Sequence, residues 1–425
     1  MAPFSLDRAN LEEQLIFWAL ALHYPVYVFG GLYVLGSVLG WLLLAVFLLR
    51  GFLTDGASSR GALRRISPLV WFWVLGMLAM LVALWVAHID RQLGTGMAIK
   101  STIGWAKGWA LLALFPLLGV ILRVRPAVLV RGVSIAAASA LPFAALGILA
   151  YGAGMSGDLY HSPLKAVGGP GEVFHIRLFG INPETGRPRW QFIGPWAPAA
   201  GLMACFYLAI ILREQNAFWR RAGIAGALFM VLLSQSRAGL AIFAIIPVLS
   251  WGIGRLREPW VLLLLGLGLP ALVLLGEPVY QAGMDAYTQV KESRPGSTRV
   301  RAALARIALQ RWEYEAPIWG HGIVERGPKI VEYMPIGTHH SWYGLLFVKG
   351  IVGLLALALP MALTCVYLLY LAQKSRLAQT GMVLCIIMVA YSFFENLEIL
   401  SYLYWPALFW LGVSLQPGQP SAKGA

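Results

Sequence analysis

The side chains best suited to chemistry in this sequence are histidines and arginines that stand beside long apolar stretches. His339 and His340 begin the apolar stretch 340–371, in the order Thr-His-His-Ser. A histidine can accept a proton near neutral pH, so one of the pair could activate a hydroxyl group as a general base. On a continuous helix, His339 would lie about 20° and 40° from Gly350 and Gly353, above a face that permits close packing. This register favours His339 as the base and His340 as a structural or acceptor-binding residue, while a purely structural hydrogen bond is the alternative for either.

Arginines dominate the segment 277–339, which comes before the two histidines. A guanidinium group binds phosphate oxygens through two parallel hydrogen bonds, whereas an ammonium group is a point charge. We interpret the set as an anion-binding site, although for each single arginine a pairing with a nearby glutamate is the alternative. The set comprises Arg294, Arg299, Arg301, Arg306, Arg311 and Arg326, beside Lys291 and Lys329.

Two more arginines stand between other apolar stretches. Arg237 lies in Ser-Gln-Ser-Arg-Ala-Gly at 234–239. A guanidinium there costs little only if it reaches water or phosphate, so we expect it to bind an anion rather than cap a helix. Arg189 stands beside Trp190 and Trp196, which an aromatic belt at a membrane surface would also explain.

Glu395 and Lys107 could support such a site. Glu395 and Glu398 are three residues apart and share a helix face, where they could orient an arginine or the base. A polar helix end is the alternative for the glutamates, and a lysine extended towards a membrane surface is the alternative for Lys107.

The segments around these residues contain no metal-binding pattern. His-Glu-x-x-His, a Cys/His cluster and Asp-x-Asp are all absent from their sequences. The sequence therefore predicts a reaction without metal or cofactor, in which cationic side chains meet the charge of an anionic substrate.

The composition indicates that membrane-spanning helices position these residues. Of the 425 residues, 59% are hydrophobic and 12% are charged, about half the charge of an average soluble chain. This excludes a disordered or water-soluble globular protein. The net charge of +14 comes from cations between apolar stretches, so it predicts membrane topology and no nucleic-acid partner. Cys205, Cys365 and Cys385 lie inside apolar stretches as small hydrophobic residues.

The hydrophobic pattern predicts an all-α polytopic membrane protein with about twelve transmembrane helices, or eleven as the alternative. A helix needs about 20 apolar residues to cross a bilayer. The stretch from Leu11 to Leu49 is too long for one helix and predicts two, separated near His23–Pro25 and Gly30–Gly31. Further spans are expected at 66–88, 101–122, 127–151, 193–212, 220–234, 238–254, 259–276, 340–371, 379–398 and 400–415.

Arginines in alternate loops predict the orientation of the helices. With both termini in the cytoplasm, every inner loop contains arginine or lysine, as the positive-inside rule requires. Residues 1–425 then form one membrane domain, with outer segments at 152–192 and 277–339. The larger outer segment predicts a helix near 298–314, begun by Ser297 or Thr298 and stopped by Pro317.

Three motifs resemble the bacterial O-antigen ligase family, within the ligases and polymerases that act on lipid-linked oligosaccharides. They are Ser-Gln-Ser-Arg-Ala-Gly at 234–239, Ala-Pro-Ile-Trp-Gly-His-Gly at 316–322, and His339-His340 followed after nine residues by Gly350-x-x-Gly353. His340 stands where the family usually has Asn, Ser or Gln. The resemblance covers about the last 200 residues by motif.

The resemblance implies a glycosyltransferase in the bacterial inner membrane with a periplasmic active site. The family transfers polysaccharide from undecaprenyl pyrophosphate to a sugar hydroxyl of lipid A core, without metal, and its fold resembles the polytopic glycosyltransferases with lipid-linked donors. His339 would be the base of an inverting displacement. Arg237, Arg189 and Arg301 would hold the pyrophosphate, with Arg299 or Arg306 as alternatives to Arg301.

Other functions share part of these features. An O-antigen polymerase, or an enzyme that transfers the oligosaccharide to protein, would have the same donor site and base. A transporter or flippase of lipid-linked sugars is the more distant alternative, and would need cations at several depths along its path.

Overall fold

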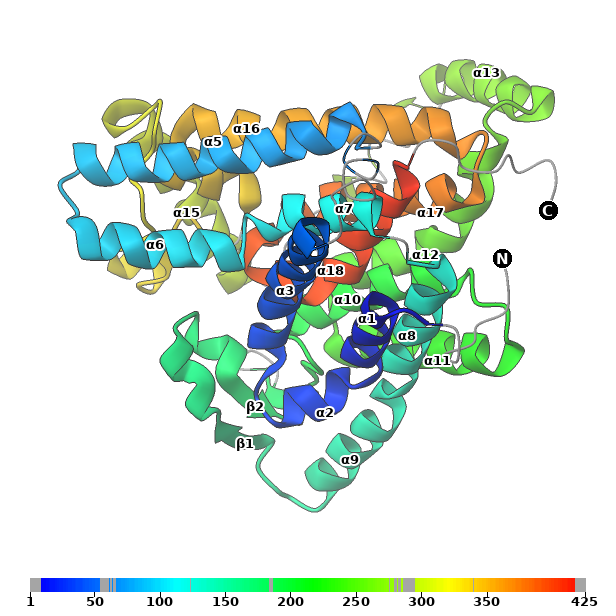
Figure 1. The fold of residues 1–425 in the computed structure, drawn as a ribbon, viewed down its shortest axis with the longest axis horizontal. Coiled ribbons are helices and arrows are strands. Elements are labelled where there is room, and N and C mark those ends of the chain that lie inside the picture. The colour runs from blue at the N-terminus through cyan, green and yellow to red at the C-terminus, as the bar shows by residue number, and fades with distance from the viewer. Residues whose placement is uncertain are drawn as a thin grey trace.

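The computed structural model describes most of the chain and confirms the all-α class (Figure 1). The described residues are 9–53, 61, 63, 66–122, 124–182, 186–274, 276–278, 281, 284–285, 295–338 and 340–416. Of residues 265, 269, 271–274 and 295–298 only the backbone is described. Regular structure in these ranges is almost entirely helical.

Helices follow one another along the whole chain. The first part forms α1 (Leu11–Ala21), α2 (His23–Val28), α3 (Leu32–Leu53), α5 (Pro68–Asp90), α6 (Thr95–Lys107), α7 (Leu111–Ile121), α8 (Pro126–Ala138) and α9 (Ala140–Gly152). The second part forms α10 (Ala197–Ile211), α11 (Ala217–Ser234), α12 (Arg237–Gly252), α13 (Pro259–Leu274), α15 (Pro295–Glu315), α16 (Ser341–Ala372), α17 (Arg376–Ser392) and α18 (Leu397–Ser414).

Short strands occur in the two segments expected outside the membrane. Antiparallel pairs are formed by β1 (Asp158–His161) with β2 (His175–Arg177), β3 (Gly180–Ile181) with β4 (Pro188–Arg189), and β5 (Glu325–Arg326) with β6 (Pro335–Ile336). Single 3₁₀ turns complete them: η1 (Pro163–Val167), η2 (Gly171–Phe174) and η4 (Lys329–Val331), while η3 (Ile253–Arg255) follows α12.

The described helices make the chain a multi-pass membrane protein. Six helical stretches are long and apolar enough to cross a bilayer: Leu32–Leu53, Pro68–Asp90, Pro126–Gly152, Ala217–Ser234, Arg237–Arg255 and Ser341–Ala372. The pair α6 and α7 makes a seventh if it is counted as one span. Shorter apolar helices lie at Ala197–Ile211, Pro259–Gly268 and Arg376–Ser392. Twelve crossings stay a prediction.

The first apolar stretch divides near Gly30–Gly31 as the sequence predicts, but into three helices, of which α1 and α2 are too short to cross a bilayer and α3 is long enough, so two spans here stay a prediction. Helices α1 and α2 end at the turn before α3, where Gly30 adopts φ of +71°. By contrast, the stretch 101–122 is not one continuous helix, because α6 and α7 are bent by 41° at Gly108. A Cβ on Gly108 would lie 3.1 Å from the Glu398 carbonyl oxygen, and Ser401 Oγ donates to the Gly108 carbonyl at 3.2 Å. Helix α18 therefore packs directly against the bend.

Small residues let the helix backbones approach closely. A Cβ on Gly76 of α5 would lie 2.3 Å from the Ala356 carbonyl oxygen of α16, and these two helices run side by side (Figure 1). Between α7 and α18, a Cβ on Gly412 would lie 2.0 Å from the Pro116 carbonyl oxygen. Lipid chains are as apolar as leucine, so such close packing stabilises helix pairs in a membrane better than apolar contact alone.

Ion pairs and hydrogen bonds join the helix ends and loops at each end of the molecule. At one end, arginines pair with buried glutamates and join neighbouring helix ends: Arg50 with Glu12, Arg125 with Glu13, and Arg131 with Glu214. At the other end, the Tyr160 hydroxyl donates to Val28 O at 2.6 Å, and Arg91 donates to Glu315 O at 2.8 Å. The first outer segment therefore lies beside the α2–α3 turn, and the end of α15 lies beside the α5–α6 turn.

A small second core anchors α15 to this end. Val300 and Leu304 of α15 pack with Val331, Ile336 and Phe347. Phe347 belongs to α16, so the outer segment is attached by apolar packing to the helix that follows it.

Candidate functional site

The N-terminus of α16 is capped by His340. Its ring Nδ1 accepts a hydrogen bond from the Tyr343 backbone N–H at 3.3 Å, and the two rings stack with centroids 4.0 Å apart. The His340 backbone N–H donates to Oδ1 of Asn396 at 3.1 Å. Burial, and secondly the charge of Arg301, lower the pKa of His340 to about 4. His340 is therefore neutral at pH 7, and its Nδ1 lone pair is engaged as a helix cap.

His339, the predicted base, lies outside the described residues. Its neighbours on both sides are anchored. The Thr338 hydroxyl donates to a backbone carbonyl at 2.6 Å, and the Gly337 carbonyl accepts from Nδ2 of Asn396 at 3.3 Å. Asn396, in the turn between α17 and α18, thus holds the chain before His339 and also the chain after it, at His340.

Glu395 is the buried centre around which several elements meet. Only 4% of its surface is exposed. Its Oε2 accepts a hydrogen bond from Trp196 Nε1 at 2.9 Å, and its backbone carbonyl accepts from the Ser341 hydroxyl at 2.6 Å. Burial raises the pKa of Glu395 to about 7, against the opposing effects of Arg301, Trp196 and Arg189. This carboxyl group is therefore close to half-protonated at neutral pH.

Arg301 is the arginine of α15 that faces this centre. It is half-buried, and its charge acts on both His340 and Glu395. The sequence left Arg299 and Arg306 as alternatives. Both instead line a separate pocket with Lys329. The structure therefore distinguishes these three arginines by the surroundings of each one.

Arg311 follows the alternative interpretation, in which an arginine pairs with glutamates. It forms ion pairs with Glu315 at 2.7 Å and with Glu325 at 2.6 Å. Arg311 and, less strongly, His321 lower the pKa of Glu315 to about 2. Arg326 lies over the ring of Tyr333, 4.6 Å from its centroid, and Arg294 lies outside the described residues.

Arg189 closes the C-terminus of α11. Its Nε donates to the Ser234 carbonyl at 2.7 Å and one terminal nitrogen donates to the Gln235 carbonyl at 3.4 Å. These carbonyls end the helix and have no partner inside it, so a cation stabilises them. The charge of Arg189 also acts on Glu395, and thereby relates the α11–α12 turn electrostatically to the buried carboxyl group.

Arg237 is the first residue of α12, in that same turn. Gln235 adopts φ of +51°, and Ser236 caps α12 by accepting from the Gly239 N–H at 3.2 Å. A Cβ on Gly201 would lie 2.6 Å from Ser236 Cβ, so α10 packs tightly on the turn. The Ser-Gln-Ser-Arg-Ala-Gly motif thus builds a rigid turn that starts α12 with a half-buried arginine.

Helix α16 is broken at Gly350, which the sequence did not predict. Gly350 adopts φ of +62° and ψ of −162°, a conformation that glycine alone adopts readily. The turn 316–322 fills the break: His321 N–H donates to Phe347 O at 2.8 Å, and Gly322 N–H donates to Val348 O at 2.9 Å. The expectation that His339 and Gly350 share one continuous helix is therefore wrong, because His340 is the cap of α16 and the helix restarts after Gly350.

The lysine next to the break in α16 is buried. Lys349 is only 3% exposed, and its charge interacts with that of Glu398 on α18. One oxygen of Glu398 accepts from Asn396 Nδ2 at 3.1 Å. The two glutamates that the sequence considered together thus have different partners, since Glu395 binds Trp196 and Glu398 faces Lys349.

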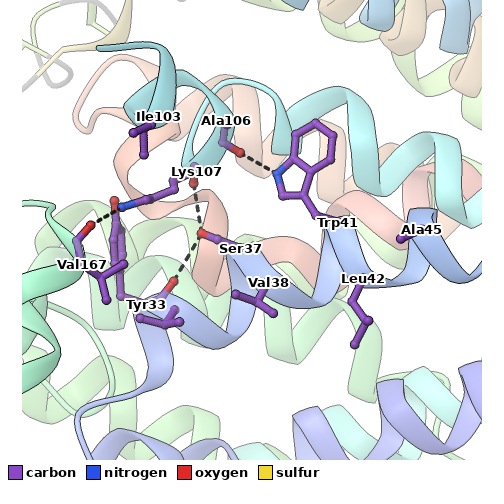
Figure 2. A pocket seen from close by; sticks show the side chains of 11 residues that line it. Tyr33, Ser37, Val38, Trp41, Leu42, Ala45, Ile103, Ala106, Lys107 and Val167 are labelled. Atoms are coloured by element: carbon purple, nitrogen blue, oxygen red, sulfur yellow. Dashed lines mark hydrogen bonds between the residues drawn. The ribbon is translucent and has the colours of Figure 1, made fainter. Parts of the chain in front are cut away.

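Lys107 lies in a groove between α3 and α6. Its ammonium group donates to Val167 O at 2.7 Å and to Gly168 O at 3.1 Å, so it joins α6 to the first outer segment (Figure 2). The groove has a volume of about 540 Å³, and side chains such as Tyr33 and Trp41 make its walls apolar. Among the described contacts, none joins Lys107 to the residues around Glu395.

Sequence reasoning gave too little weight to Trp196 and Asn396. Trp196 was explained by an aromatic belt, whereas its indole N–H points to Glu395. Asn396 links the start of α16 to the α17–α18 turn. The available signal was weak: both residues lie two or three positions inside the end of a predicted span, whereas in the structure they are the N-caps of α10 and α18.

The fold and this cluster define a multi-pass membrane protein with an arginine-rich site at the ends of its helices. Residues 222–358 match the family model of O-antigen ligases, which confirms the resemblance over this part of the chain. The matched range includes Arg237, Arg301, the turn 316–322 and the break at Gly350. No curated protein matches the chain. The family supports a function of the O-antigen ligase or polymerase type.

Proposed function

We propose that the protein is an O-antigen ligase that transfers polysaccharide from undecaprenyl pyrophosphate to a sugar hydroxyl of lipid A core. One observation carries the proposal: the buried Glu395, on which the charges of Arg301 and Arg189 act, is hydrogen-bonded through its backbone carbonyl to Ser341 at the N-terminus of α16, next to the cap His340. The α11–α12 turn, with Arg237, is hydrogen-bonded to Arg189 and so belongs to the same region. Arginines are well suited to bind the two phosphates of the donor.

The reaction is a single displacement at the anomeric carbon. His339 accepts the proton of the acceptor hydroxyl, the new bond from oxygen to the anomeric carbon forms, and the bond to the pyrophosphate oxygen breaks with inversion. Arg237, Arg301 and Arg189 stabilise the negative charge that develops on the leaving pyrophosphate. His340 does not take part in proton transfer, because its Nδ1 caps α16.

The positive charge of the arginines supports a mechanism without a metal ion. The arginines supply the charge that a divalent cation provides in many other glycosyl transferases. Purified protein is therefore expected to keep its activity in excess chelator. A loss of activity that only magnesium or manganese restores would contradict this mechanism.

An acceptor panel separates the ligase from related enzymes. Purified protein in nanodiscs is supplied with the lipid-linked donor and, separately, with core lipid, free glycan or a pilin-like protein. Transfer to core lipid alone is expected. Elongation of the donor glycan would instead identify a polymerase, and transfer to protein would identify an oligosaccharyltransferase.

The site is proposed to face the periplasm of the bacterial inner membrane, with both termini in the cytoplasm. A single cysteine at Gly186 should react with an impermeant thiol reagent in intact spheroplasts, and one at Arg376 should not. Residue 186 belongs to the first outer segment and Arg376 begins α17 at the opposite end. The reverse labelling pattern would put the arginines on the cytoplasmic side.

A further inference from the structure

A second cationic site lies on the other side of α15. Arg299, Ala302, Ala303 and Arg306 form one wall of a pocket of about 590 Å³, and Lys329, Ile330 and Glu332 form the other wall. We call this the α15 pocket. Its residues come from the large outer segment.

The α15 pocket is separate from the arginines around Glu395. Residues 299, 302, 303 and 306 follow the spacing of one helix face, whereas Arg301 lies about 200° around the helix from Arg299. Arg301 acts on Glu395 and His340. One anionic group therefore cannot contact Arg301 and the pocket at the same time, so the two sides of α15 need two ligands.

Apolar packing between α15 and η4 fixes the two walls of the pocket relative to each other. Val300 and Leu304 of α15 pack against Val331 of η4 in the small second core. Glu332 and Tyr333 adopt φ of +54° and +60°, values that side chains rarely adopt, and the Glu332 N–H donates to the Lys329 carbonyl at 2.9 Å. Such backbone conformations persist where the surrounding structure fixes them, and they are frequent at ligand sites.

The cations of the pocket lack the partners that other arginines have. Within the described residues, Arg299, Arg306 and Lys329 form no ion pair, whereas Arg311 on the same helix binds two glutamates. Glu332 is the acidic residue of the lining. Three cations facing one carboxylate in a concave site attract an anion, and the arginine forks suit phosphate or carboxylate oxygens.

We propose that the α15 pocket binds a phosphate or carboxylate substituent on the acceptor saccharide; this rests on the proposed ligase function. Arg299, Arg306 and Lys329 bind the anionic group. Ala302 and the exposed side chain of Ile330 form an apolar surface for the C–H face of a sugar ring, and Glu332 accepts a hydrogen bond from a sugar hydroxyl. The donor already has its pyrophosphate on the Arg301 side, so the second anion belongs to the acceptor.

Binding without donor tests the pocket independently of transfer. Protein in nanodiscs is titrated with core glycolipid that retains its phosphates and with the same glycolipid after their removal. Arg299→Gln and Arg306→Gln should each weaken binding of the phosphorylated form about tenfold, as expected for loss of one charge-assisted contact, and should leave the other form unchanged. Arg326→Gln is the matched control, because Arg326 lies on the same outer segment but over Tyr333. It should bind like the wild type.

The outcomes separate the two proposals. Unchanged affinity in both pocket variants, or an equal loss for both forms of the glycolipid, would overturn the α15 pocket as an anion site. A loss confined to an acidic donor glycan, titrated in parallel, would overturn its assignment to the acceptor. Phosphate-selective binding by a wild-type protein that transfers nothing would reject the ligase function and leave the pocket in place.

Discussion

Trp196 Nε1 donates a hydrogen bond to Oε2 of Glu395 over 2.9 Å, and so connects the start of α10 to the turn between α17 and α18. The same turn holds α16 through Ser341 and His340. The turn at Glu395 and Asn396 therefore joins the ends of α10, α16 and α18, and its contact with α10 is made by the buried carboxyl group across 199 residues of sequence.

Glu395→Gln is expected to change how stability depends on pH. Burial raises the pKa of Glu395 from 4.5 to about 7, so its contribution to stability is present below pH 4.5 and is lost as pH rises through 7. Glutamine keeps an acceptor for Trp196 but cannot ionise. Between pH 5 and pH 8, the Tm of the wild type should fall by a few degrees more than that of the variant. Parallel Tm curves would contradict the raised pKa.

His339→Ala is expected to lower turnover by about 10² to 10⁴, the usual contribution of a general base. Donor affinity should change far less, because the arginines that bind pyrophosphate remain. The measurement compares kcat with the Kd of the lipid-linked donor. Near-normal turnover would exclude His339 as the base.

His340→Asn is the matched control for His339→Ala, because it should preserve the hydrogen bond that caps α16. Asparagine is among the best helix caps, so it can replace His340 Nδ1 as the acceptor of the Tyr343 N–H. The variant should keep its activity, whereas His340→Ala should lose about 1 kcal/mol of stability with the cap. An inactive His340→Asn beside an active His339→Ala would assign the base to His340.

Arg301→Lys is expected to reduce kcat at least tenfold while the protein remains folded, because lysine keeps the charge but not the two-pronged hydrogen bonding. Arg306→Lys is the comparison on the same helix, and at saturating acceptor it should leave kcat unchanged since Arg306 lines the α15 pocket. Equal losses of kcat from the two substitutions would show that the two sides of α15 do not have separate roles.

Gly350→Ala is expected to destabilise the protein strongly. A Cβ at this position would lie 2.2 Å from the Ile318 carbonyl oxygen, at φ of +62°. Monodisperse yield and Tm should both fall. Gly104→Ala is the control, because a Cβ there meets no atom within 4 Å. A normal Tm for Gly350→Ala would mean that the break is not needed for the fold.

The sequence predicts the all-α membrane class because apolar length depends on local composition alone, whereas twelve spans stay a prediction. The division between α2 and α3 was predictable from the Gly30-Gly31 pair, since such pairs favour turns. The break at Gly350 was not predictable, because a break in a helix does not change its hydropathy. The backbone groups at the break bond instead to a turn about 30 residues earlier, for example to the His321 N–H. Only tertiary contacts satisfy those groups.

Sequence spacing also has limited power to predict the surroundings of the candidate site residues. Helical spacing separates Arg299 from Arg301, but spacing alone does not say which of them faces the other helices. The position of α15 on Phe347 decides this. Likewise, the resemblance implies that Arg189 holds the pyrophosphate, but spacing does not reveal that it caps the carbonyls of Ser234 and Gln235, which lie 45 and 46 residues away in sequence.

The broken helix α16 has a consequence for biogenesis. Gly350 lies nine residues after the first residue of α16, about 14 Å along a helix long and apolar enough to cross a bilayer, where an unpaired backbone group would be costly. The Phe347 and Val348 carbonyls need the turn 316–322, which leaves the ribosome before α16 does. Chain order thus delivers the partner first, so the turn 316–322 must be in place before α16 reaches its final shape. Fusion proteins that retain the helices but remove this segment should insert and then be degraded.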